Sequence, residues 1–449
     1  MSKLAILGGD PVRTDPFPDW PRPTSALGDS VLKTLQNENW GVGSDAITRF
    51  EEAFAAFQDA KYCISTSSGT TALWVALKAA GVKAGDEVII PAYTFIATAS
   101  AVLMANAIPV FVDIDEKTLN IDPELIEAAI TEKTKAIMPV HIAGNPADLD
   151  RICTIGKQHG IAIVEDAAQA HGAIWNGKKV GAIGLGGIFS FQTSKNMTAG
   201  EGGTIVTNDD DFKEACFSYH NCGRVSGGEW YEHQHLGGNF RLNALAASML
   251  IPQLETIGTD MDLRDKNKKK LDEGLAQIDG IELLESYKQT TRSAHHLYIV
   301  KYKKEAFNGI HRNVFFKAMQ AEGVYTFAGY SPLYREKLFV TDPEEYPWLK
   351  NQNYSSLSLP VTERICDDES AWLKQNHLLG NDNDIHDSAI IINSKLSHCT
   401  VSKNCHVENS ELNNVIMLQG SKVLRQNIDN AIVGYDEVIE SKRVEIIKN

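Results

Sequence analysis

FSFQTSKNMTAGEGG, residues 189–203, begins as an apolar strand and then breaks into hydroxyl side chains, one lysine and three glycines. A lone lysine is usually a solvated surface residue. This lysine lies in a turn whose glycines would let the backbone approach a flat ring closely. A lysine in an enclosed pocket has a lowered pKa and a free lone pair, so it could form a Schiff base with a carbonyl compound. The stretch therefore predicts a catalytic role for Lys195.

The chain around this stretch alternates between short apolar runs and segments with helical periodicity. The runs include DEVIIPAY (86–93), IPVFVDI (108–114) and AIVEDAAQ (162–169), and helical segments such as ATASAVLMANA (97–107) lie between them. Strands that alternate with helices form α/β domains with a parallel sheet. We therefore expect an α/β fold with a mixed, mainly parallel sheet.

Composition changes along the chain predict four segments. Five prolines within residues 8–24 indicate an extended N-terminal arm over residues 1–45. The alternating pattern predicts a large domain over residues 46–255. Strands and helices then mix, which indicates a smaller α+β domain over residues 256–386.

Residues 387–449 form a tail of different character. Aliphatic residues recur there at roughly six-residue steps, interleaved with Asn, Ser and Gly. This pattern resembles the hexapeptide repeats of left-handed β-helices, whose coils are each too small to bury a face alone. The alternative is an irregular, strand-rich extension.

The overall composition limits the classes of function. The chain has 449 residues, of which 43% are apolar, and 43 Lys and Arg against 58 Asp and Glu give a net charge of -15. That charge disfavours nonspecific binding to nucleic acid or to an anionic membrane. Seven scattered cysteines without a CxxC pair fit reduced thiols, and no apolar run approaches the ~18 residues of a membrane span. We expect a cytoplasmic protein with no membrane or nucleic-acid partner and no metal site.

Three further clusters offer groups for binding a flat, charged cofactor. The turn at Ser67–Thr71 precedes a helix and could hold a phosphate, although an ordinary helix N-cap has the same composition. Glu165 and Asp166 end an apolar strand, where a carboxylate could hold a ring nitrogen protonated or could cap a helix. Tyr93 and Phe95 follow another strand, and either ring could stack on a cofactor or pack in the core.

Phosphate cup, aromatic ring, carboxylate and lysine together are the groups that a pyridoxal 5′-phosphate site requires. The motifs SSGTTAL (67–73), PAYTFIATA (91–99), VEDAAQAHGA (164–173), SFQTSKNMTAGEGGTIVTND (190–209) and GGNFRLNALAASM (237–249) resemble, in order, those of the DegT/DnrJ/EryC1/StrS aminotransferases. The resemblance spans roughly residues 5–385. It implies fold type I of the pyridoxal phosphate enzymes, with a large and a small domain, in a homodimer. The tail has no counterpart in most members of that family.

The resemblance also implies roles for individual residues. Lys195 would form the internal aldimine and move protons, and Asp166 would pair with the pyridinium nitrogen. Gln169 would lie against the ring or its 3′-oxygen, and Phe95 would stack on it. The phosphate would be held by Ser68, Gly69, Thr70 and Ser190, and by Asn239 of the neighbouring subunit.

The resemblance is to the branch that holds cyclitol (inosose) aminotransferases and aminohydroxybenzoate synthases. It implies transfer of an amino group from glutamate or glutamine to a keto-cyclitol or keto-sugar, in aminosugar or aminocyclitol biosynthesis. Lys195 supports transamination, because one branch of dehydratases carries histidine at this position. The alternatives are an aminohydroxybenzoate-type synthase, which is a lyase, and a non-catalytic scaffold or sensor.

Overall fold

The computed structural model describes residues 3–36, 39–340 and 346–379, and the strands of the tail between residues 384 and 440. The chain divides into two units, which are described separately. The larger consists of Trp20–Lys317 and Tyr325–Gln375, and the smaller of Met1–Asp19, Ala318–Val324 and Asn376–Asn449. The boundary predicted between residues 255 and 256 falls inside one long helix, α8 (Ala244–Leu275).

A seven-stranded sheet in the order β1-β9-β8-β5-β4-β2-β3 forms the centre of the larger unit. The strands from β8 to β3 run parallel, and β9 pairs antiparallel with both β8 and β1. The predicted mixed, mainly parallel sheet is therefore confirmed. The strands are β1 (Tyr62–Thr66), β2 (Glu87–Pro91), β3 (Ile108–Val112), β4 (Thr134–Ile137), β5 (Ala162–Asp166), β8 (Gly186–Ser190) and β9 (Gly203–Thr207).

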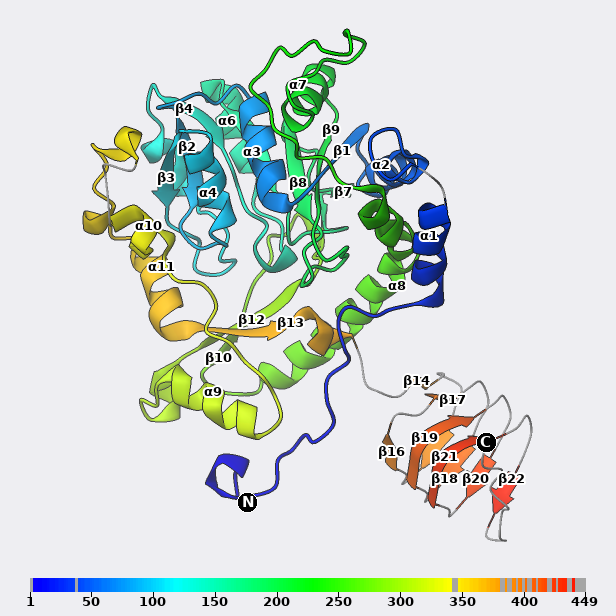
Figure 1. Cartoon of the computed structure of the whole chain (residues 1–449). Helices are drawn as coiled ribbons and strands as arrows, with labels where there is room; N and C mark the ends of the chain where they lie inside the picture. Colours follow the sequence, from blue (N-terminus) through cyan, green and yellow to red (C-terminus); the bar gives the residue numbers. More distant parts are fainter. Residues whose placement is uncertain are drawn as a thin grey trace. The chain divides into compact units, whose positions relative to one another are not determined.

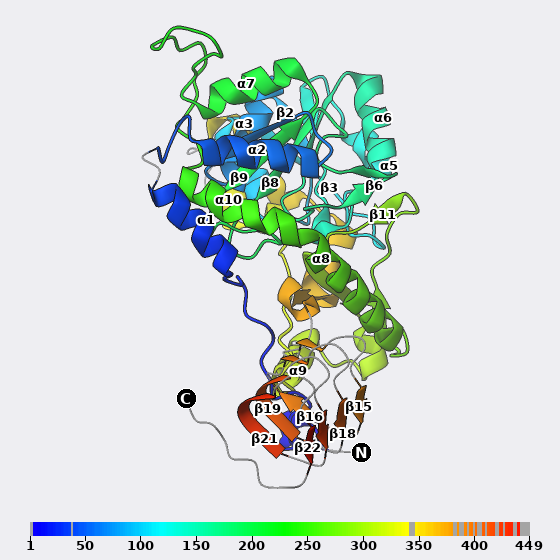
Figure 2. The same cartoon turned by 90° about the vertical axis from the view of Figure 1, so that its right-hand side faces the viewer.

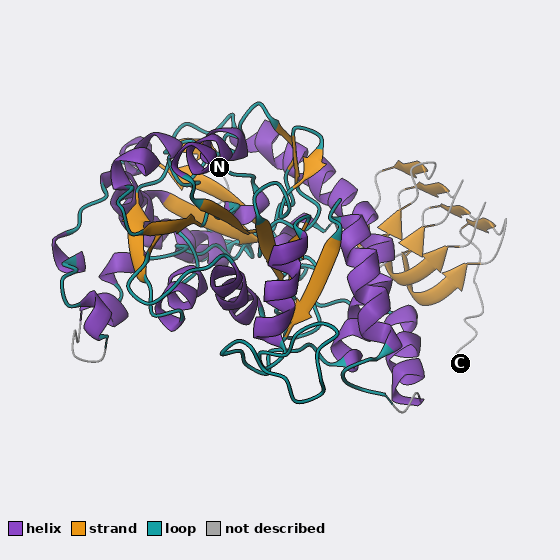
Figure 3. Cartoon of the chain, turned by 90° about the horizontal axis from the view of Figure 1, so that it is seen from above, coloured by secondary structure: helices purple, strands orange, loops and turns teal. Residues whose placement is uncertain are grey.

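Helices cover both faces of this sheet, because its strands carry apolar side chains on both sides (Figures 1 and 3). Val88 and Ile90 belong to the core that packs under α3, α4 and α7, whereas Ile89 belongs to the core under α6. Alternate residues of a strand point to opposite faces, so one strand contributes to both cores. The helices are α2 (Asp45–Phe57), α3 (Gly69–Ala79), α4 (Ala97–Met104), α5 (Pro123–Ile126), α6 (Leu149–His159) and α7 (Asp210–His220).

Part of the expected N-terminal arm is helical. Helix α1 spans Ser25–Gln36 and lies along α8 (Figure 2). The prolines stop at Pro23, and the Thr24 hydroxyl accepts a hydrogen bond from the Leu27 N–H at 3.2 Å, which caps the first turn. The run of prolines thus indicated extended chain only up to the point where the helix begins.

Smaller elements complete the larger unit. An antiparallel sheet in the order β10-β12-β13 consists of Ile281–Leu283, Leu297–Tyr302 and Ser370–Lys374, and a second one joins β11 (Thr290–Arg292), β6 (Ile174–Trp175) and β7 (Lys178–Lys179). The remaining helices are α9 (Arg312–Ala321), α10 (Lys337–Val340) and α11 (Pro360–Arg364). No helix among the described residues is both long enough and apolar enough to cross a bilayer.

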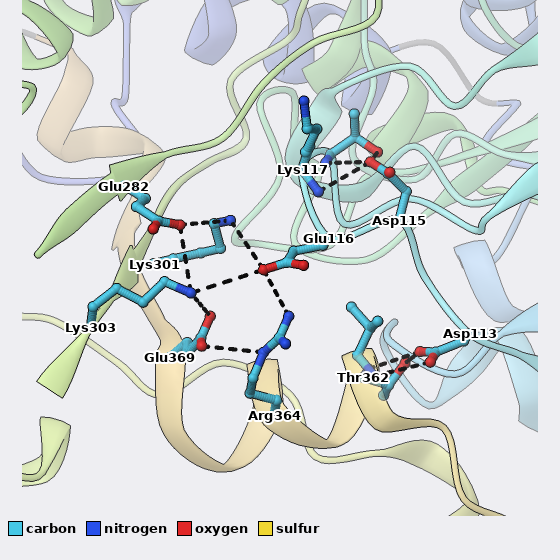
Figure 4. A network of polar contacts seen from close by, with 12 residues as sticks. Asp113, Asp115, Glu116, Lys117, Glu282, Lys301, Lys303, Thr362, Arg364 and Glu369 are labelled. Carbon is cyan, nitrogen blue, oxygen red and sulfur yellow. Dashed lines mark hydrogen bonds and ion pairs between the residues drawn. The ribbon is translucent and has the colours of Figure 1, made fainter. Parts of the chain in front are cut away.

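A network of charges joins the loop after β3 to the sheet of β12 (Figure 4). Glu116 lies 4.0 Å from Lys301 of β12 and 2.8 Å from Arg364, and Lys303 lies 2.8 Å from Glu369. Beside them, Asp113 is buried and accepts hydrogen bonds from the N–H groups of Val361 and Thr362 at 3.0 and 2.8 Å. This carboxylate therefore anchors the first turn of α11 to the end of β3.

Replacing Asp113 by alanine is expected to lower the free energy of unfolding by about 3 kcal/mol, because several buried hydrogen bonds to a charged group are lost at once. Denaturant titration of Asp113→Ala measures this. The exposed Asp45, replaced in the same way, is the control and should have little effect. A stability of Asp113→Ala equal to that of the control would show that this anchor does not matter.

The described strands of the tail pair in parallel at a constant step (Figure 3). Ile391 pairs with Val407, Val407 with Val423, and Val423 with Ile439, a step of sixteen residues each time. A coil of a hexapeptide-repeat left-handed β-helix, with three sides of six residues each, would instead contain about 18 residues. Parallel rungs are typical of a β-solenoid, and the left-handed β-helix stays a prediction. The strands are β14 (Asp384–Ile385), β15 (Ile390–Ile392), β16 (Lys395–Ser397), β17 (Thr400–Val401), β18 (His406–Glu408), β19 (Glu411–Met417), β20 (Lys422–Leu424), β21 (Asn427–Val433) and β22 (Val438–Glu440).

Candidate active site

The sheet topology brings the predicted lysine and carboxylate to one edge. β5 ends at Asp166 and its parallel neighbour β8 ends at Ser190, five residues before Lys195. The carboxyl ends of parallel strands are where ligands bind in α/β sheets. The two residues also interact electrostatically, as the shift in the lysine pKa shows.

Asp166 is held in place by groups on two neighbouring segments. It is buried, and its Oδ2 accepts a hydrogen bond from the Thr98 hydroxyl at 2.8 Å while Oδ1 accepts one from the Ala168 N–H at 3.2 Å. Burial raises the pKa of this carboxyl, and the Thr98 hydrogen bond opposes that rise. A buried carboxylate with an elevated pKa is well suited to share a proton with a ring nitrogen.

Glu165 has a different role, which the sequence left open. Successive residues of a strand point to opposite faces, so Glu165 and Asp166 diverge. Glu165 is fully buried, and its carboxylate accepts hydrogen bonds from the N–H groups of Gly181, Ile183 and Gly184 at 2.7–2.8 Å. It therefore anchors the turn before β8.

Lys195 has the electrostatic properties of a nucleophile. Desolvation of its ammonium group lowers the pKa of Lys195 to about 8, and the Asp166 carboxylate opposes this shift. Burial likewise lowers the pKa of His171 to about 3 and that of His296 well below its usual value, so both imidazoles near the lysine are neutral. A pKa of about 8 leaves a usable fraction of free amine at neutral pH.

The predicted phosphate cup is the N-terminus of α3. The Ser68 hydroxyl accepts the Thr71 N–H at 3.1 Å and so caps the helix, which leaves the N–H groups of Gly69 and Thr70 as the unsatisfied donors typical of a first turn. A Cβ at Gly69 would lie 2.8 Å from the Cβ of Ser190, so only glycine allows α3 and β8 to approach this closely. The cup thus combines the positive end of a helix with a serine hydroxyl.

The two aromatic residues that could stack on a ligand differ in their burial. Tyr93 is fully buried, and its hydroxyl contacts Ser370 and Trp372 at 2.9 Å, so it belongs to the core. The ring of Phe95 is 55% exposed, although it lies directly after the same strand. An exposed ring at the edge where Asp166 and Lys195 lie is available to cover a flat ligand.

Gln169 is buried and held at both ends of its amide. Its Oε1 accepts the Ala143 N–H at 2.8 Å, and its Nε2 donates to the Tyr330 hydroxyl at 3.1 Å. Neither Tyr330 nor Thr98, the partner of Asp166, was predicted individually. Tyr330 lies far along the chain from Gln169, and no motif marks its position. Thr98 follows Thr94 by one helical turn, which is a weak signal.

Asn239 lies next to the cup but has an exposed side chain. Its segment pairs with Asn221, and the Phe240 carbonyl accepts the Ser67 N–H at 2.6 Å. Trp230 and Tyr231, in the preceding loop, are 82% and 75% exposed. The structure therefore places Asn239 at the rim of the site, with its side chain directed away from the core.

Taken together, these groups can hold a phosphate, share a proton with a ring nitrogen, cover a flat ring and bind a carbonyl carbon covalently. These are separate functions of four segments that lie far apart in the sequence. The sheet order β8-β5-β4-β2, with α3 packed against β8, is what brings them to one edge.

Comparison with known proteins identifies the family. The model of the DegT/DnrJ/EryC1/StrS aminotransferase family matches residues 25–374. L-glutamine:2-deoxy-scyllo-inosose aminotransferase from Streptomyces lividus is 35% identical over 429 residues, which cover 88% of this chain and 98% of that protein. 3-Amino-5-hydroxybenzoate synthase from Amycolatopsis mediterranei (strain S699) is 36% identical over 381 residues, which cover 84% of this chain and 96% of that protein. The crystal structure of 3-amino-5-hydroxybenzoic acid synthase has a TM-score of 0.74 at 34% identity and covers 82% of this chain and 95% of that chain. The chain belongs to the DegT/DnrJ/EryC1/StrS aminotransferase family and is an enzyme of that family, not a scaffold.

Proposed function

We propose that the enzyme uses pyridoxal 5′-phosphate to move an amino group from glutamine or glutamate to the keto group of a cyclitol or sugar. The observation that carries the proposal is the pairing of Lys195, with its lowered pKa, and the buried Asp166 at the ends of adjacent parallel strands. The donor set fits this cofactor: a helix N-terminus for its phosphate, a carboxylate for its ring nitrogen, an exposed ring to cover it and an amine for its aldehyde.

Each residue then has a defined task. Pyridoxal phosphate, when bound, supplies an electron sink for the charge left by removal of a proton from the donor's α-carbon. Lys195 Nζ would hold the aldehyde at rest, and its free amine would then take up that proton and release it in the later proton transfer. The Asp166 carboxylate would keep a proton on the ring nitrogen, and the Thr98 hydroxyl keeps the carboxylate oriented.

The remaining groups position the cofactor. Gly69, Thr70 and Ser190 would hold its phosphate at the cup, and the capping of α3 by Ser68 keeps the first turn of the helix in shape. Phe95 would cover the ring, and Gln169 would lie at its edge.

The choice of substrate rests on the relatives. The name of the relative from Streptomyces lividus gives glutamine as the amino donor and a deoxy-inosose as the acceptor. We therefore propose glutamine as the amino donor and a keto-cyclitol as the acceptor. The experiment is an acceptor screen with the cofactor-loaded enzyme and glutamine or glutamate, comparing inososes with nucleotide-linked keto-sugars. Amination of an inosose supports the proposal, and exclusive amination of nucleotide-linked sugars would refute the acceptor.

The similarity to 3-amino-5-hydroxybenzoate synthase supports a second candidate, an aromatising lyase that uses the same lysine. The donor half-reaction separates the two. Glutamine or glutamate alone should convert the bound cofactor to pyridoxamine phosphate in an aminotransferase, with a matching change in absorption. Absence of this conversion, together with loss of water from an aminocyclohexenone substrate, would favour the lyase.

We further propose a homodimer in which Asn239 completes the phosphate site of the partner. A mixture of Lys195→Ala subunits and Asn239→Ala subunits, each with low activity alone, is expected to regain activity after subunit exchange. One site of each mixed dimer then contains both residues. Exchange is verified with two affinity tags. Mixed dimers without recovered activity would contradict the shared site.

A further inference from the structure

The segment that carries Tyr330 is held rigidly against β13. Phe327 and Trp372 exchange backbone hydrogen bonds at 3.2 and 3.0 Å. Gly329 has a φ of +83°, and a Cβ there would lie 2.5 Å from Cε2 of Trp372. The ring of Tyr330 then packs on that indole edge to face, with centroids 4.6 Å apart at 85°. The position of the tyrosine is therefore fixed by the backbone and by packing before any ligand binds.

The hydrogen-bond directions around Tyr330 follow from its partner. The Oε1 of Gln169 must accept, because its contact is the backbone N–H of Ala143. This fixes the amide orientation, so Nε2 is the group that faces Tyr330 and donates to it. The Tyr330 oxygen is thus an acceptor in this contact, and its own proton is directed elsewhere.

That proton has no acceptor in the part of the chain that the structure describes, where the hydroxyl contacts Gln169 alone. Burial raises the pKa of the hydroxyl, so it stays protonated at any working pH. Tyr330 is half-buried, and a ligand that covers its hydroxyl would leave the O–H in a water-free site, where an O–H without an acceptor is costly. An acceptor that arrives with a ligand would remove this cost.

The surroundings indicate which ligand supplies it. The ring centroids of Tyr330 and Phe95 are 6.4 Å apart. The Tyr330 hydroxyl also interacts electrostatically with the Asp166 carboxylate. Tyr330 is therefore near Phe95, Asp166 and Gln169, three of the residues assigned above to the cofactor, although it comes from a different part of the chain.

We propose that the Tyr330 hydroxyl donates a hydrogen bond to an oxygen of the molecule bound between Phe95 and Lys195. Two sources share this chemistry: the phenolic ring oxygen of the cofactor, and a carboxylate or hydroxyl oxygen of a substrate. The proposal rests on the proposed use of pyridoxal phosphate, and it adds a ligand-binding residue from the segment after α9.

The test is Tyr330→Phe, which keeps the ring and its packing and removes only the hydroxyl. Tyr334→Phe is the matched control, because the Tyr334 hydroxyl in the same segment contacts Glu363 at 2.6 Å instead. A single cooperative melting transition in each apo-protein confirms that both variants fold. Each protein is then loaded with pyridoxal phosphate, and its visible band is titrated with pH without substrate.

If the acceptor is the cofactor's phenolic oxygen, loss of the donor raises the electron density on that oxygen, and the titration midpoint rises by about one pH unit in Tyr330→Phe alone. If the acceptor is a substrate oxygen, the midpoint is unchanged and the KM for donor or acceptor rises roughly tenfold. A midpoint and KM values equal to those of Tyr334→Phe would overturn the proposal. A wild-type protein that forms no visible band would instead contradict the use of the cofactor.

Discussion

Lys195→Ala is expected to lose the visible absorption band of the lysine-linked cofactor and to lower turnover by roughly 10^3-fold or more. The lysine supplies both the covalent link and the group that moves the proton, and among the described residues no other lysine has a pKa lowered to about 8. Stopped-flow absorption with glutamine measures the donor half-reaction, and a coupled assay measures the full reaction.

The fold should survive this change, because Lys195 lies in a turn rather than in the packed core. The circular dichroism spectrum and melting temperature of the apo-protein check this. Lys178→Ala, which removes an exposed lysine, serves as the control and should behave like wild type. Turnover of Lys195→Ala within about tenfold of the control would assign the chemistry to another residue.

Asp166→Asn is expected to retain bound cofactor and to lower the rate of the donor half-reaction by roughly 100-fold or more. The amide oxygen can still accept the Thr98 hydroxyl proton, and only the longer contact with the Ala168 N–H is lost. A neutral amide cannot stabilise a positive charge on the ring nitrogen, so the electron sink weakens. Single-turnover kinetics with glutamine measure the effect, and equilibrium dialysis measures cofactor binding.

The neighbouring carboxylate provides a matched control for Asp166→Asn. Glu165→Gln should lower the melting temperature, since Glu165 anchors the turn at residues 181–184 through three hydrogen bonds. The folded fraction should keep a nearly normal rate. Equal rate losses in the two variants would indicate that position 166 acts through structure and not through charge.

Much of the site could be predicted from the sequence because the ends of its strands can be recognised in the sequence pattern. Asp166 and Ser190 each terminate an apolar run, and neighbouring parallel strands place their carboxyl ends at one edge. The same logic could not separate Glu165 from Asp166 or Tyr93 from Phe95. That choice depends on which side chain faces the core, so in the sequence it could be made only through the family resemblance.

Residues whose role depends on contacts distant in the sequence could not be predicted. Tyr330 meets Gln169 through the pairing of its segment with β13, which no local pattern encodes. In the tail, the strand pairs repeat at sixteen residues, a period between whole coils that the roughly six-residue steps of the aliphatic residues do not display. The pairing register reveals the longer period because it compares whole coils.

Lys195 is the residue to which we propose that pyridoxal phosphate is attached. The most direct test is reduction of the cofactor-loaded wild-type protein with borohydride, followed by proteolysis and mass spectrometry of the peptides. We expect one stoichiometric pyridoxyl label, on the peptide that contains Lys195, and no label after prior incubation with glutamine. A label on any other lysine, or no label in a protein that binds the cofactor, would contradict this assignment.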